Sequence, residues 1–204
     1  DAMTIVAWVG SLTLLISGLA ALFQSDLKRI LAYSTVSQIG YMILALGAGA
    51  WAEGTFHLMT HAFFKALLFL TAGSIILKMH HQQNIFNMGG LMKKLPLESA
   101  LFVIGLLCLM ALPGTSGFFS KEAIIAQLWS SPTAGASLWW CAVVGALITS
   151  IYSCRLFFLA FLGRSRFEQP LVASNSKTLK GALLALTLLS VIGGLLAPDL
   201  SSVF

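Results

Sequence analysis

The apolar residues of this chain are gathered into runs of about 20, and this grouping constrains the fold more than any other feature of the sequence. A helix of that length crosses the hydrocarbon core of a bilayer, which is about 30 Å thick. Hydrophobic residues make up 58% of the chain and charged residues 9%, so there are too few polar side chains to cover a water-soluble surface around the apolar ones. The sequence therefore predicts an all-α integral membrane protein and excludes a soluble domain.

Polar and turn-forming residues divide the chain into six expected crossings, which together make a polytopic helix bundle. The chain begins DAMTIVAWVG, already within an apolar run and without the basic region of a signal peptide, so we interpret it as an internal part of a longer protein. The expected crossings are Ala2–Phe23, Leu27–Ala48, Gly54–Leu77, Leu97–Trp129, Leu138–Leu162 and Leu179–Ala197.

The basic residues between the crossings all fall on one side of this predicted bundle. Six crossings place the connections alternately on the two faces of the membrane, and the connections of the opposite side carry no Lys or Arg. The positive-inside rule therefore predicts that the basic loops are cytoplasmic. The net charge of +5 is explained by this topology, and we expect no nucleic-acid partner. The basic residues of this side are Lys28, Arg29, Lys78, Lys93, Lys94, Arg164, Arg166, Lys177 and Lys180.

Two histidines and a lysine form a column inside the third crossing. His57, His61 and Lys65 are spaced four residues apart, so they lie along one helical face, each about 6 Å further along the axis. An ionised lysine near the middle of a bilayer costs about 2.5–3.5 kcal/mol, which calls for a functional reason. Such a column, with water between its members, can accept and pass protons. The plainer alternative is a set of interhelical hydrogen bonds, but three such groups on one stripe favour a proton relay.

A metal or haem site is a weaker interpretation of the same residues. The spacing of His57 and His61 also occurs in zinc sites, but the string HLMTH lacks the glutamate of HExxH, and the next group on the face is a lysine, which is not a ligand. A haem held between helices requires a histidine on a second crossing, and no other expected crossing contains one. We therefore expect no metal and no cofactor.

The fourth crossing is too long for one straight helix and contains a helix break. As a single helix, Leu97–Trp129 would be about 50 Å long, far more than the hydrocarbon core requires. The string ALPGTSGFFSKE in its middle combines Pro113, which removes a backbone donor, with Gly114 and Gly117, which lower the cost of unwinding. Backbone groups freed at this depth must be buried in protein or line a wet cavity, and interrupted helices mark ion sites in transporters. The sequence therefore predicts a broken helix.

Lys121 and Glu122 follow this break within a turn or two. A lysine so close to freed backbone groups is a candidate proton carrier. The alternative is a simple proline kink, with Lys121 paired to Glu122 near a membrane interface.

The second crossing is too polar for a helix that faces lipid. Lys28 lies at its start and is either a proton-uptake group or an anchor for the topology, and by itself it indicates an anchor. Three further polar residues share one face of this helix and could hold waters: Ser34, Gln38 and Tyr41.

Four strings carry a resemblance to a known family: SDLKRILAYSTVSQIGYM, FHLMTHAFFKALLFLTAGSII, HHQQNIFNMGGLMKKLPL and GFFSKE. They are similar to the antiporter-like subunit L of bacterial NADH–quinone oxidoreductase (respiratory complex I), a family that includes subunits of multi-subunit sodium/proton antiporters. The resemblance is dense from Gln24 to Glu122 and thins afterwards, although the pattern of crossings continues.

This resemblance implies two inverted five-helix repeats in the whole protein, each with a broken helix and half of a proton pathway. Residues 1–162 resemble the second repeat, and residues 163–204 correspond to a cytoplasmic loop and one additional transmembrane helix. The family's first repeat and its long lateral helix have no counterpart here, so this chain alone is not expected to pump.

The resemblance also implies roles for individual residues. Lys121 would be the key lysine of the broken helix, and an acidic neighbour such as Glu122 is usual in the family. His57, His61 and Lys65 would link that lysine to a central polar axis, and Lys28 would be a further pathway lysine.

The resulting prediction is a proton-translocating subunit of NADH–quinone oxidoreductase in the bacterial inner membrane. Buried His and Lys would relay protons, driven by quinone reduction elsewhere in the complex. The expected partners are the other membrane subunits of complex I, the lipid bilayer, protons and internal water. We find no residues suited to holding flavin, an iron–sulfur cluster or nicotinamide, so any oxidoreductase activity would belong to the assembly.

Two other functions remain open at this point. The first is a subunit of a multi-subunit sodium/proton antiporter, and the second is a non-transporting membrane scaffold. Sodium sites tend to need carboxylates, and Glu122 is the carboxylate available inside a crossing, which favours protons.

Overall fold

The computed structural model describes residues 2–131, 135–172 and 177–196. Within these ranges the regular structure is helical, apart from one isolated bridge between Asp26 and Asn84, and the predicted all-α fold is confirmed. The α-helices are α1 (Ala2–Phe23), α2 (Leu27–Gly47), α3 (Trp51–Lys78), α4 (Leu91–Lys94), α5 (Pro96–Leu109), α6 (Ser116–Ser130), α7 (Gly135–Phe161) and α8 (Lys177–Ile192), and the short 3₁₀ helices are η1 (Ile85–Asn87) and η2 (Gly193–Leu196).

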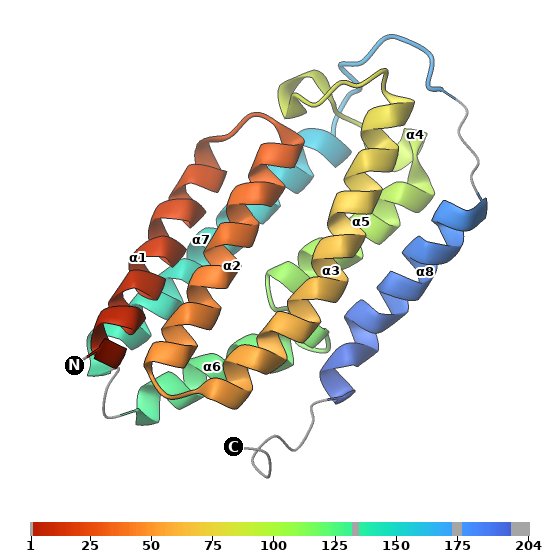
Figure 1. Cartoon of the computed structure of the whole chain (residues 1–204). Helices are drawn as coiled ribbons and strands as arrows, with labels where there is room; N and C mark the ends of the chain where they lie inside the picture. The colour runs from red at the N-terminus through yellow and green to blue at the C-terminus, as the bar shows by residue number, and fades with distance from the viewer. Residues whose placement is uncertain (1, 132–134, 173–176, 197–204) are drawn as a thin grey trace.

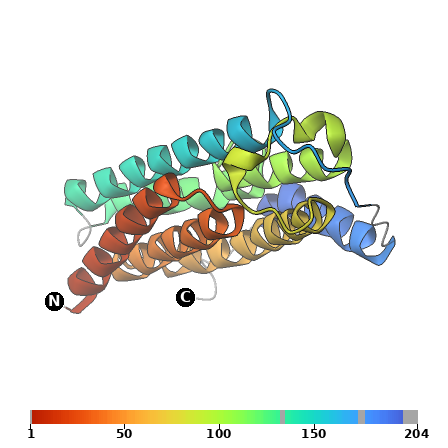
Figure 2. The same cartoon turned by 90° about the horizontal axis from the view of Figure 1, so that it is seen from above.

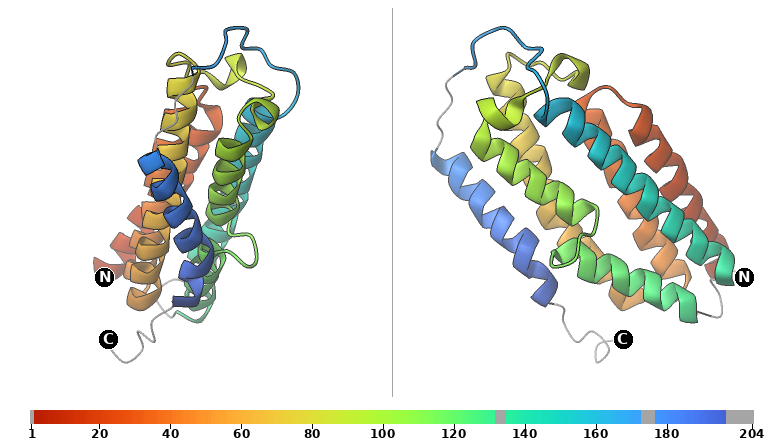
Figure 3. Two further views of the ribbon diagram at one scale, coloured as in Figure 1. Left: turned by 90° about the vertical axis from the view of Figure 1, so that its right-hand side faces the viewer. Right: turned by 180° about the vertical axis from the view of Figure 1, so that it is seen from behind.

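Five helical segments are long and apolar enough to cross a membrane: α1, α2, α3, α7 and the segment Lys177–Leu195, which contains α8. The shorter apolar helix α5 and the helix α6 together form the expected fourth crossing. Figure 1 shows the long helices side by side along one direction, and the right-hand view of Figure 3 shows α5 and α6 in succession, separated by a loop. The predicted bundle of six crossings, the fourth one broken, is confirmed, and the helix ends that the structure describes lie within a few residues of those expected. The expected end of the sixth crossing, Ala197, lies outside the described residues.

The α1–α2 pair is packed with the two backbones in close contact. A methyl group added at Gly40 of α2 would lie 2.8 Å from the carbonyl oxygen of Gly10 and 2.8 Å from the Cα of Leu14, both on α1. Small residues at such a contact let two membrane helices approach, and the dispersion forces gained there replace the hydrophobic effect that lipid does not supply. Gly40 is therefore a packing residue of the helix pair.

We expect Gly40→Ala to lower the thermal stability of the protein, because the new methyl group meets backbone atoms that cannot turn aside. Overpacking of this kind typically costs about 1–3 kcal/mol. The matched control is Gly73→Ala in α3, where an added methyl group meets nothing within 4 Å. Thermal unfolding of the two variants in detergent measures the effect, and equal midpoints would show that the close approach at Gly40 is not important for stability.

Three connections, with the basic residues on them or in the adjoining helix ends, lie together at one end of the bundle, which we call the basic end (Figures 1 and 2). They are the α1–α2 connection, the segment between α3 and α5, and the part of the α7–α8 connection that the structure describes. Backbone hydrogen bonds join them: Leu27 donates to the carbonyl of Gln83 at 2.9 Å, and Arg166 donates to the carbonyl of Met88 at 3.3 Å. The predicted gathering of basic loops on one side is thus present in the fold.

Candidate functional site

The predicted helix break lies between the end of α5 at Leu109 and the start of α6 at Ser116. Two residues in the break have positive φ angles, 60° at Ala111 and 89° at Gly114. Pro113 lies between them and has no backbone N–H to donate. The chain therefore leaves the helical conformation here and resumes it in the next helix, as the sequence predicts.

Gly117 lets the first turn of α6 pack directly against the end of α5. A methyl group at this position would overlap the carbonyl oxygen of Cys108. One turn further along, the Lys121 Nζ donates a hydrogen bond of 2.9 Å to the carbonyl oxygen of Leu109. The last carbonyls of a helix have no partner within the helix, so this buried amino group satisfies an acceptor that the break has freed. Only 2% of the surface of Lys121 is exposed.

His57 joins three helices at the centre of the bundle. Its Nδ1 lies 2.8 Å from the Ser120 Oγ of α6, and its Nε2 lies 3.1 Å from the Gln38 Oε1 of α2. The Thr60 hydroxyl, one turn along α3, donates to the Ser120 Oγ at 2.8 Å. All four side chains are fully buried. An imidazole bonded at both ring nitrogens can take a proton on one side and release one on the other.

Lys65 points inward to α2 and not to lipid. Its Nζ donates to the carbonyl oxygen of Leu31 at 3.1 Å and also to the Ser34 hydroxyl. The Ser34 hydroxyl in turn donates to the same Leu31 carbonyl at 2.9 Å. Lys65 is 5% exposed, so its amino group is held by neutral oxygens in the interior.

His61 lies between His57 and Lys65 in the column, as the spacing predicts. The centres of the two imidazole rings are 6.0 Å apart, and His61 is buried. Its Nε2 and the Nε2 of Gln38 have no hydrogen-bond partner among the protein groups that the structure describes. Buried polar atoms normally have partners, so these two atoms leave hydrogen-bonding capacity for water.

These groups all lie in the buried interior of the bundle, and we call them together the polar axis. It combines the three-residue column of α3 with polar groups of α2 and α6. Its members are Ser34, Gln38, His57, Thr60, His61, Lys65, Ser120 and Lys121.

Among the described residues, the two lysines of the polar axis have no carboxylate partner. Lys121 Nζ lies 5.2 Å from the centre of the Tyr41 ring, a cation–π contact. Within the described part of the chain, the structure shows a salt bridge between Lys78 and Glu98 at the basic end but none at Lys65 or Lys121. The alternative that pairs Lys121 with Glu122 is therefore wrong, because Glu122 is exposed on the outer side of α6.

Two of the expected site residues lie outside the polar axis. Lys28 is exposed in the first turn of α2, at the basic end, and Glu122 is exposed on α6. Their expected roles in the pathway stay predictions. The expectation that Glu122 is the carboxylate available inside a crossing is wrong, because Glu98 also lies within the expected crossing Leu97–Trp129. Glu98 begins α5 and is buried against Lys78.

Sequence reasoning missed Ser120 and Thr60, which connect the histidine column to the broken helix. A signal for each was available, because Thr60 lies one turn from His57 and Ser120 immediately precedes Lys121. Tyr152 of α7 was also missed. It is 1% exposed and carries a hydroxyl buried in the bundle, but an isolated tyrosine in an apolar run gives no signal of its own.

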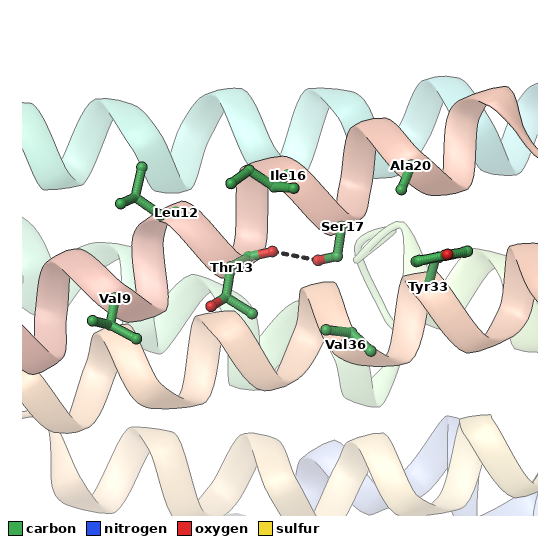
Figure 4. A pocket seen from close by; sticks show the side chains of 8 residues that line it. All are labelled: Val9, Leu12, Thr13, Ile16, Ser17, Ala20, Tyr33 and Val36. Carbon is green, nitrogen blue, oxygen red and sulfur yellow. Dashed lines mark hydrogen bonds between the residues drawn. The ribbon is translucent and has the colours of Figure 1, made fainter.

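A groove on the α1–α2 surface, of about 440 Å³, lies apart from the polar axis (Figure 4). Its wall is mostly aliphatic, and the Ser17 hydroxyl within it is bonded to the carbonyl of Thr13. Such a surface suits acyl chains and lacks the groups that proton transfer requires. The lining residues are Val9, Leu12, Thr13, Ile16, Ser17, Ala20, Tyr33 and Val36.

The sequence matches the family described as NADH:quinone oxidoreductase/Mrp antiporter, transmembrane, over residues 1–152. It is 52% identical to the NADH-quinone oxidoreductase subunit L of Pseudomonas aeruginosa and 48% identical to that of Escherichia coli strain K12. Both alignments cover 100% of this chain and 33% of the relative, so the chain spans about a third of the length of these relatives.

Two solved structures share the fold. An archaeal respiratory membrane complex, the membrane-bound sulfane sulfur reductase, contains a chain with 31% identity and a TM-score of 0.88, over 99% of this chain and 34% of that one. The Mrp complex of a Dietzia species contains a chain with 24% identity and a TM-score of 0.83, over 95% of this chain and 44% of that one. The second likeness concerns the fold alone.

Proposed function

Because the chain belongs to the NADH:quinone oxidoreductase/Mrp antiporter transmembrane family, we propose that it forms a half-channel for protons in a membrane subunit of an NADH–quinone oxidoreductase. The observation that carries this proposal is the polar axis, in which two buried lysines and two buried histidines face the interior of a membrane-spanning bundle. Charged groups at that depth are costly, and in membrane proteins they mark ion pathways and proton relays.

The side chains of the polar axis suit proton transfer between neutral and cationic groups. Lys65 and Lys121 each bind a proton at Nζ, and Ser34, Ser120 and the imidazole of His57 can accept a proton at one lone pair and release another. A proton that moves along these groups and intervening waters breaks one N–H or O–H bond as it forms the next. No net charge then has to rest on a group that faces lipid.

Coupling to the redox reaction would act through charge. Two cations in an interior of low dielectric constant repel each other more strongly than in water, so protonation of one favours deprotonation of the other. Quinone reduction elsewhere in the complex would change the charge at one end of the axis, and Lys65 and Lys121 would change protonation in turn. Any redox centre lies in the partner subunits in this proposal.

We assign residues 1–162 to the second five-helix repeat and residues 163–204 to a cytoplasmic loop and an additional transmembrane helix. The packing supports an added helix, because Leu183 of α8 lies on the outside of the α3–α5 pair, against Leu67 and Leu101. The basic end would face the cytoplasm of a bacterium, by the positive-inside rule. The partners would be other membrane subunits of complex I, the surrounding lipid and internal water.

A sodium/proton antiporter subunit is the rival within the same family. The position of Glu122 weighs against it, because this carboxylate is exposed on α6 and does not reach the polar axis. Lysine, imidazole and hydroxyl groups line the axis, and lysines repel sodium ions. We therefore favour protons as the transported ion.

The experiment that tests this function is Lys65→Met in the full-length subunit within its membrane complex. We expect proton pumping by inverted vesicles to fall about tenfold while the complex still assembles, since a positioned proton-transfer group contributes at least that much to a transfer step. The control is Lys93→Met, which removes the same charge from an exposed position. A scaffold without transport predicts the opposite pattern, with normal pumping per assembled complex and reduced assembly.

A further inference from the structure

The hydrogen bonds of the polar axis fall into separate groups on the two sides of one turn of α2. Lys65 and Ser34 form one group, and Gln38, His57 and Ser120 form the other. Ser34 and Gln38 are four residues apart on the same helix, about 6 Å along its axis, which is too far for a direct hydrogen bond. A proton that passes from Lys65 to His57 by way of the α2 side chains crosses this gap.

Tyr152 of α7 lies beside the gap. Its hydroxyl lies near the side chains of Ser34, Gln38 and Thr149, but it has no hydrogen-bond partner among the described groups. The residue is 1% exposed, so this hydroxyl cannot be satisfied by bulk solvent or by lipid headgroups. Its position between the two hydrogen-bonded groups is the observation on which the inference rests.

The neighbouring amide of Gln38 is in the same situation. Its Oε1 is engaged with His57, but its Nε2 is fully buried and has no partner among the described groups. The Gln38 Nε2 of α2 and the Tyr152 Oη of α7 are therefore both buried and both lack a hydrogen-bond partner among the described groups. Buried waters in proteins typically make about three hydrogen bonds, and they do so to polar groups that are otherwise unsatisfied.

We propose that Tyr152 is a positioning residue of the proton pathway, whose hydroxyl holds a water between Ser34 and Gln38. The inference deepens the proposed function and rests on it. The water would accept a proton from the side of Ser34 as it releases another toward the histidines, so one O–H bond forms as another breaks and nothing is oxidised or reduced. The amide of Gln38 would orient this water without carrying the proton itself.

The substitution that tests the inference is Tyr152→Phe in the full-length protein within its membrane complex. It keeps the ring and its packing but removes the hydroxyl. Loss of one hydrogen bond weakens the binding of the bridging water about fivefold, and we expect the number of protons pumped per electron to fall, by up to a similar factor. The matched control is Tyr33→Phe, which removes the hydroxyl of a tyrosine that is 39% exposed on the outer side of α2, and it should leave the ratio unchanged.

Pumping by Lys65→Met is measured in parallel, which separates the role of Tyr152 from the proposed function. If Lys65→Met impairs pumping and Tyr152→Phe does not, the role of Tyr152 is refuted and the proposed function stands. If neither variant impairs pumping, the proposed function itself fails.

A direct readout covers the case in which Tyr152→Phe does not assemble. A cryo-EM map of the unmodified complex at a resolution that shows waters should contain one within hydrogen-bond distance of both the Tyr152 Oη and the Gln38 Nε2. Density for that water supports the inference, and a well-ordered site without it overturns the inference whatever the variant does.

Discussion

Replacing Lys121 by methionine is expected to stop proton transfer past the helix break, with a loss of about a hundredfold in the rate of that step. This is the lower end of what a positioned acid or base contributes to proton transfer. The substitution removes the one titratable side chain that the structure places on the freed carbonyl of Leu109. It also leaves that buried acceptor without a donor, which costs about 1–3 kcal/mol of stability.

The measurement is the initial rate of proton uptake by inverted vesicles, together with the rate of electron transfer and the amount of assembled complex. A second variant, Lys121→Arg, separates charge from proton release. Arginine keeps a cation and hydrogen-bond donors near Leu109, but it does not deprotonate in proteins. We expect Lys121→Arg to restore assembly relative to Lys121→Met but not to restore pumping. Full pumping with arginine would show that Lys121 acts as a fixed charge and does not carry protons.

The helix break and the histidine column were predictable because their signals are rare in apolar segments. A lysine or histidine inside a crossing is costly, so each occurrence carries information, and the spacing of His57, His61 and Lys65 fixes their common face once α3 is a helix. The run of residues around Pro113 is likewise compatible with few structures other than a helix break. The interruption between α5 and α6 confirms the helix break, although Pro113 and Gly114 themselves are exposed. The burial of His57, His61 and Lys65 on one face of α3 confirms the column.

The partners of these residues could not be predicted in the same way. Serines, threonines and tyrosines are common in membrane helices, and the sequence does not state how each helix is rotated about its axis or which helices meet. The neighbours of Ser120 and Tyr152 in the polar axis are known only once α6 and α7 are placed beside α3 and α2. Glu122 illustrates the same limit, because adjacent residues on a helix differ by about 100° in direction. Its neighbour Lys121 is buried, and Glu122 is exposed.

Gly117→Ala tests whether the packing of the helix break positions the lysine of the polar axis. The added methyl group would overlap the backbone carbonyl of Cys108, which cannot rotate away as a flexible side chain can. The start of α6 must then shift away from α5, which costs about 1–3 kcal/mol as other forms of overpacking do. Because Lys121 follows one turn later, its contact with Leu109 should lengthen, and we expect pumping to fall about tenfold, less than for removal of the lysine itself.

The matched control is Gly181→Ala in α8, where an added methyl group meets nothing within 4 Å. It should pump and unfold like the unmodified protein, apart from the small gain that alanine gives a helix over glycine. The geometric explanation also requires that a loss of pumping in Gly117→Ala persists below the unfolding temperature of that variant. If Gly117→Ala pumped normally while its stability was reduced, the close contact with Cys108 would hold the fold together without setting the position of Lys121, and the break would serve proton transfer only by freeing its backbone carbonyls.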